Sequence, residues 1–116
     1  MDFFVIDDGA DSPPAVLRLV ANLRRMGWKT DYSFKRNKTP KQLKEALRRG
    51  AAAAIFLRRA EGAISPDGFD LALKNLRNEK QYPQRLFIGE FLQRPELRNV
   101  RSIEQFLDRF GLAGES

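Results

Sequence analysis

The chain has 116 residues, and 21 lysines and arginines against 15 aspartates and glutamates give it a net charge of +6. It contains no histidine and no cysteine, which excludes disulfides, thiolate nucleophiles, the usual zinc sites and a histidine general base. No apolar run approaches the roughly 20 residues of a membrane-spanning helix. We expect one folded, cytoplasmic domain that spans residues 1–116.

The first predicted element is a short buried strand at residues 2–6, followed by an acidic pair, Asp7-Asp8. Such a pair holds Mg²⁺ in the phosphoacceptor domains of two-component signalling, where a third aspartate ends the third strand. Here the third predicted strand ends in Leu57-Arg58-Arg59, which excludes that class and leaves a metal site without its ligands. We interpret the pair as carboxylates near the first helix, stabilised by its dipole and by local capping.

The first helix and the second strand follow. Ser12 is a good N-cap, Pro13 suits the first helical turn, and Gly27 is the expected C-terminal stop. Residues 28–34 alternate between large apolar and polar side chains, which predicts a strand with one buried face. Its aromatic side chains are expected in the core, with exposed stacking surfaces as the alternative.

The second predicted helix presents a basic face. Thr39 is its expected N-cap, and Gly50 ends it. The predicted inner stripe consists of Leu43, Ala46 and Leu47. Three cations at spacing i, i+3, i+7 share the face roughly opposite that stripe: Lys41, Lys44 and Arg48.

The excess positive charge lies in one central block. Residues 34–60 carry nine basic side chains and a single acidic one, Glu45, whereas the segments before and after each carry a net charge of −1. Such a concentration predicts a surface that binds a polyanion. The alternative is a solvated face whose counter-charges lie elsewhere in the fold.

Further strands complete the predicted sheet. Residues 51–57 are an uninterrupted apolar run that we interpret as the third strand. Residues 65–68 predict a turn, and residues 69–76 alternate as a fourth strand. Residues 80–88 suit a fifth strand at the edge of the sheet, where Pro83 is tolerated.

The last predicted helix begins at a capping box formed by Ser102 and Gln105 and ends at Gly111. The order β-α-β-α-β, followed by two strands and a helix, predicts an α/β fold. We expect a three-layer sandwich with a mixed, mainly parallel five-stranded sheet and helices on both faces. The first strand should lie at or near the centre, parallel to the second and third.

The segment KRNKTPKQLKEALRRGAAAAIFLRRAE, residues 35–61, resembles the anticodon-binding domain of class II aminoacyl-tRNA synthetases, most closely the histidyl-tRNA synthetase type. In that family a lysine-rich helix, K-x-Q-x-K-x-A-x-x-x-G-A, leads directly into an apolar third strand. Glu61 matches a family glutamate after that strand, and residues 73–76 resemble a later family strand. The resemblance extends over residues 2 to about 82.

The resemblance implies a non-catalytic RNA-binding module whose partner is tRNA or another RNA. In such modules lysine and arginine hold phosphates, while hydrogen bonds and stacking read splayed bases. The expected nucleic-acid-binding residues are Lys35, Arg36, Lys38, Lys41, Lys44, Arg48, Arg58 and Glu61. Glu61 would accept a hydrogen bond from a base amino group; the alternative is a surface glutamate paired with Arg58 or Arg59.

The chain departs from the family pattern in three places. The family glycine that ends the third strand is Arg58 here, the Gly-Thr-Val that opens the fourth reads Phe69-Asp70-Leu71, and residues 84–101 are additional. These departures affect base-specific reading more than the fold. The alternative function is therefore a synthetase-paralogue domain that has lost tRNA reading and contacts a protein partner or a synthetase catalytic domain. We expect no catalytic residue, metal or cofactor, because no glycine-rich phosphate loop follows a strand.

Overall fold

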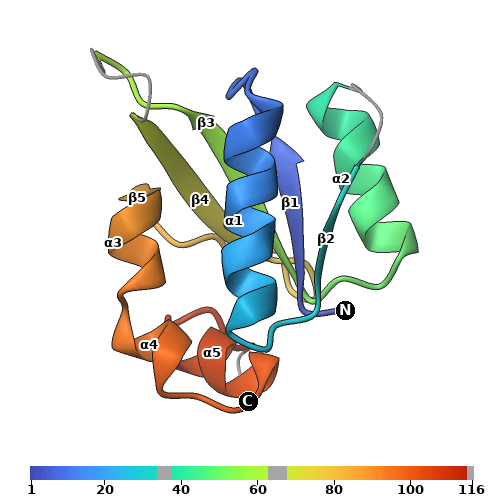
Figure 1. Cartoon of the computed structure of the whole chain (residues 1–116). Helices are drawn as coiled ribbons and strands as arrows, with labels where there is room; N and C mark the ends of the chain where they lie inside the picture. Colours follow the sequence, from blue (N-terminus) through green and yellow to red (C-terminus); the bar gives the residue numbers. More distant parts are fainter. Residues whose placement is uncertain (34–37, 63–67, 115–116) are drawn as a thin grey trace.

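The computed structural model describes residues 1–33, 38–62 and 68–114 (Figure 1). Its elements, in chain order, are β1 (Phe3–Asp7), α1 (Pro13–Arg25), β2 (Thr30–Tyr32), α2 (Thr39–Arg48), β3 (Ala53–Arg59), β4 (Phe69–Asn75), β5 (Leu86–Phe87), α3 (Ile88–Leu92), α4 (Pro95–Arg98) and α5 (Ile103–Arg109). None of the helices in these ranges combines the length and apolar character that crossing a membrane requires. The turn predicted at residues 65–68 falls largely outside the described residues.

The strands form one five-stranded sheet in the order β2-β1-β3-β4-β5. β1 pairs in parallel with both β2 and β3, whereas β4 is antiparallel to its two neighbours. This confirms the predicted mixed sheet, with the first strand next to its centre. The predicted edge strand at residues 80–88 is much shorter than expected: β5 contains only Leu86 and Phe87. Before it, Gln81 forms one isolated bridge with Lys74 of β4. Pro83, which has no amide hydrogen to donate, lies between these two pairings.

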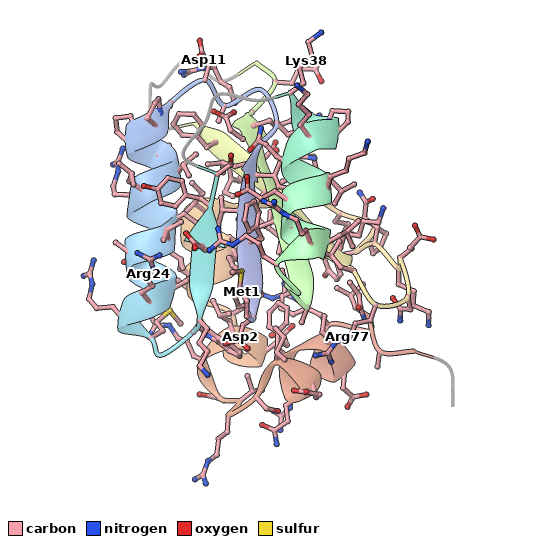
Figure 2. The ribbon with its side chains drawn as sticks, turned by 90° about the vertical axis from the view of Figure 1, so that its right-hand side faces the viewer. Met1, Asp2, Asp11, Arg24, Lys38 and Arg77 are labelled. Carbon is pink, nitrogen blue, oxygen red and sulfur yellow. The ribbon has the colours of Figure 1, made fainter. Side chains whose placement is uncertain are left out.

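Helices cover both faces of this sheet, which confirms the three-layer sandwich. β2 and β3 lie on opposite sides of β1, so crossovers of one hand place α1 and α2 on opposite faces. Figure 2 shows this arrangement, with the sheet between the blue α1 and the green α2. The helices α3, α4 and α5 pack on the same side as α1.

The main core lies between the sheet and α1 with the C-terminal helices. The Phe3 ring meets those of Trp28 and Phe106 edge-to-face, with ring centroids 5.1 and 5.0 Å apart, a favoured aromatic geometry. The predicted core position of Trp28 is therefore confirmed.

The additional segment 84–101 forms β5, α3 and α4 and closes over this core. Arg94 is its anchor: its guanidinium donates to Glu96 at 2.6 Å and lies 5.2 Å from the centroid of the Phe110 ring. The hydrogen bond to Glu96 raises the pKa of Arg94 above its usual value. The contact with the Phe110 ring joins the segment to the end of α5, whereas the hydrogen bond to Glu96 lies within the segment.

A second, smaller core lies beneath α2 and includes Phe4, Ile6 and Ala54 of the sheet. Here the predicted inner stripe of α2 is partly wrong. Ala46 is buried as expected, but Leu47 is 52% exposed, and the polar Gln42, four residues before Ala46, is buried instead. The helix is turned so that the side chain of Gln42 reaches the backbone of Asp7 at the end of β1.

Candidate nucleic-acid interface

The basic helix α2 is held at its N-terminus by the end of β1. The side-chain amide of Gln42 accepts from the Asp7 backbone N–H at 3.0 Å and donates to the Asp7 carbonyl at 2.9 Å. The Thr39 hydroxyl donates to Oδ1 of Asp8 at 2.7 Å. Thr39 is therefore not the N-cap predicted from the sequence; Lys38 occupies that position, and Thr39 lies in the first turn.

The acidic pair stabilises backbone and helix rather than forming a ligand set. Asp7 Oδ1 accepts from the backbone N–H groups of Ala10 and Asp11, at 2.9 and 3.2 Å. This is the local capping we expected, although Asp8 contacts the second helix and not the first. Within the described ranges no three histidine, cysteine, aspartate or glutamate side chains are grouped to hold a metal ion.

The outer face of α2 is exposed and positively charged. Lys41, Lys44 and Arg48 are all exposed, and their side chains make no ion pair or hydrogen bond within the described part of the chain. Lys38, at the N-cap, is exposed as well. The predicted alignment of three cations on one side of the helix is thus present, and no acidic side chain pairs with any of these three within the residues that the structure describes.

Arg49 behaves differently from these outer cations. It forms ion pairs with Asp31 of β2 and with Glu45 one helical turn earlier, and Asp31 also contacts Arg24 of α1. The basic block is therefore divided. Its side toward β2 is neutralised by acidic partners, whereas its outer side carries net positive charge.

Arg58 lies near the end of β3, and Glu61 lies two residues after the strand ends. Arg58 Nε donates to Oδ1 of Asp70 at 3.1 Å, and the Arg59 guanidinium lies 5.0 Å from the centroid of the Phe69 ring. Glu61 is exposed and has no ion pair within the described residues. The pairing of Glu61 with either arginine, our alternative interpretation, is therefore not found there.

The structure brings some of the predicted residues together and separates others. Lys38 and Arg58 both lie at the edge where the parallel strands β1 and β3 end, since α2 begins beside Asp8 and the register pairs Asp7 with Leu57. Figure 2 shows Lys38 at the same end of the molecule as the β1–α1 loop residue Asp11. Arg48 lies at the other end of α2. The predicted residues Lys35 and Arg36 fall outside the described ranges.

Sequence reasoning missed two polar contacts that shape this surface. One is the buried Gln42 described above. The other is Asp70, whose carboxylate accepts from both Arg58 and Arg85. The contact of Asp70 with Arg58 could have been found from the register of the β3–β4 hairpin, which places these two residues directly opposite each other.

No protein-family model and no curated protein sequence matches the chain. Solved structures do match it. Apo histidyl-tRNA synthetase from S. aureus is 20% identical, with a TM-score of 0.63 over 80% of this chain and 22% of that chain. Histidyl-tRNA synthetase from Nostoc sp. PCC 7120 is 18% identical, with a TM-score of 0.61 over 85% of this chain and 22% of that chain.

These matches confirm the predicted resemblance to the histidyl-tRNA synthetase type as a likeness of fold. The chain corresponds to 22% of the length of either synthetase. It is therefore similar to a part of these enzymes and not to the whole.

Proposed function

We propose that this chain is an RNA-binding module whose partner is tRNA or another RNA, and that the outer face of α2 holds the phosphates. The observation that carries the proposal is a set of exposed cations, Lys41, Lys44 and Arg48, that have no acidic partner among the described residues. Unpaired like charges on one face repel each other and favour association with a polyanion. The likeness of fold to part of histidyl-tRNA synthetases supports tRNA as the partner.

The spacing of the three cations suits a nucleic-acid backbone. Lys41 and Arg48 are seven residues apart, which is about 10 Å along a helix axis. That length corresponds to about three nucleotides of a stacked strand. Because Asp7 and Asp8 fix the start of α2, the cations form a rigid row. Lys38, at the N-cap, extends this row toward the carboxyl ends of the strands, and we propose that Lys35 and Arg36, which lie outside the described residues, also bind phosphates.

In this proposal, the residues at the end of β3 and just after it recognise the bases. Glu61 accepts from a base amino group, and the guanidinium of Arg58 contacts an adjacent phosphate or base. Arg58 replaces a family glycine, so we propose that the preference among anticodon loops differs from that of the synthetase type.

We further propose that the module is not an enzyme by itself and acts in the cytoplasm, either alone or beside a synthetase catalytic domain. Hydrolysis of ATP or of phosphodiesters that disappears on changing Asp7 or Asp8 would overturn the first of these points.

The direct experiment is titration of the purified protein with unfractionated tRNA at two salt concentrations. The proposal expects binding at low salt that weakens steeply as salt rises. Absence of any tRNA affinity at low salt would favour the alternative, a protein-interaction or regulatory domain that has lost tRNA reading.

A further inference from the structure

The α2 side of the sheet is only partly covered. α2 packs over β1 and the start of β3, through Phe4, Ile6 and Ala54. Beyond this helix, Arg58 of β3, Asp70 of β4 and Phe87 of β5 stand directly opposite one another. Residues at directly opposite positions project to the same face of a sheet.

The orientation of this row follows from its neighbours. Leu57, Leu71 and Leu86 are buried in the main core on the α1 side. Since side chains alternate along a strand, the row formed by Arg58, Asp70 and Phe87 projects to the opposite side. That is the side on which the outer face of α2 carries its unpaired cations.

The row places an exposed ring beside fixed guanidinium groups. Phe87 is 58% exposed, more than any other large hydrophobic side chain in the described ranges. The Asp70 carboxylate accepts from Arg58 and from Arg85, and Arg85 also donates to the Phe56 carbonyl at 3.1 Å. Two arginines around one carboxylate leave a net charge of +1. The side chain of Arg58 is still 41% exposed.

We propose that Phe87 is a base-stacking residue and that Arg58 holds the adjacent phosphate or base, so that a single-stranded RNA segment crosses from α2 onto the β3–β5 surface. This inference rests on the proposed function and extends its footprint to β5, within the segment that departs from the synthetase pattern. Aromatic rings on an open sheet stack unpaired bases, and guanidinium planes do the same while binding phosphates. A protein partner would also accept an exposed phenylalanine, and Glu90 lies beside Phe87, where it accepts from the Phe87 backbone N–H. The exposed cations along α2 and the exposed guanidinium of Arg58 favour a polyanion.

The test uses the full chain and a short unstructured RNA that carries a single 2-aminopurine, with a blunt RNA duplex as the second ligand. Phe87→Ala and Phe87→Leu should each weaken binding of the single strand by about 5- to 150-fold, the range for loss of one stacked base. Both variants should also lose the quenching of 2-aminopurine. Phe87→Trp should keep affinity and quenching, because it keeps a π-face. Binding of the duplex should not change, since its bases are already stacked.

Leu17→Ala is the matched control. Leu17 is 47% exposed on α1, on the other side of the sheet, so its loss should leave RNA binding unchanged. If Phe87→Ala binds the single strand as the unchanged protein does, the stacking site is wrong while the function of α2 stands. If Phe87→Leu keeps full affinity, the contact is apolar and the stacking proposal is overturned. If the unchanged protein binds neither RNA nor tRNA, both proposals fail.

Discussion

Gln42 and Asp7, 35 residues apart, are joined by two hydrogen bonds: the side-chain amide of Gln42 accepts from the backbone N–H of Asp7 and donates to its backbone carbonyl. Gln42 is 4% exposed, so the amide is removed from water, and Asp7 supplies it with one donor and one acceptor. This contact determines which side of α2 faces the sheet. It therefore also determines which side presents lysine and arginine to solvent.

Replacing Gln42 by leucine should destabilise the fold. The Asp7 N–H and carbonyl would lose these partners at a partly buried position, and an unsatisfied buried group costs about 1–3 kcal/mol. The measurement is the free energy of unfolding from urea denaturation. Gln84→Leu, at an exposed position, is the control and should change stability by less than about 0.5 kcal/mol. Equal midpoints for the two variants would show that the Gln42 contact is not stabilising.

The Thr39–Asp8 hydrogen bond should couple the start of α2 to the end of β1. In a double-mutant cycle of Thr39→Val and Asp8→Asn, we expect the two losses of stability to be non-additive, because each substitution removes or weakens the same bond. The expected interaction energy is about 0.5–1.5 kcal/mol. Strictly additive values would mean that the two side chains act independently.

Glu61→Gln should change which RNA is preferred without changing how salt affects binding. The substitution replaces a carboxylate acceptor by an amide and removes no cation. We therefore expect altered relative affinities among anticodon stem-loops that differ in one base, and an unchanged salt slope. Identical relative affinities for every loop tested would remove Glu61 from the proposed site.

Local signals in the sequence were sufficient for most of the secondary structure. Ser12 caps α1, and Ser102 caps α5 by accepting from the Gln105 backbone N–H. Gln105, however, accepts from the N–H of Arg101, so the predicted capping box is shifted by one residue on that side. The alanines of residues 51–54 alone favour a helix, so the strand was identified from an uninterrupted apolar run that directly follows a predicted helix.

Contacts between distant segments could not be predicted in the same way. The helical pattern of apolar residues favours Leu47 over Gln42 for the inner face. Hydrophobicity alone does not show that backbone groups at the end of β1 need a hydrogen-bond partner. The exposed position of Phe87 depends on the register of β5 with Asp70. Pairing of a two-residue strand leaves almost no trace in the sequence.

The most direct test of the central claim is the salt dependence of tRNA binding by a variant in which Lys41, Lys44 and Arg48 are all changed to Gln. Each phosphate contact contributes a slope of about 0.7 in log affinity against log salt for single strands. The triple variant should therefore flatten the slope by about 2 and weaken binding to all RNAs alike. Its stability should hardly change, since surface substitutions usually cost less than about 0.5 kcal/mol.

The matched control removes the same charge elsewhere, by changing the exposed Arg25, Lys29 and Arg101 to Gln. It should leave the slope close to that of the unchanged protein. A phosphate-binding role for the outer face of α2 predicts a flattened slope in the α2 variant alone. Equal slopes for the α2 variant and the unchanged protein, or equal flattening in both variants, would contradict a phosphate-binding role for this face.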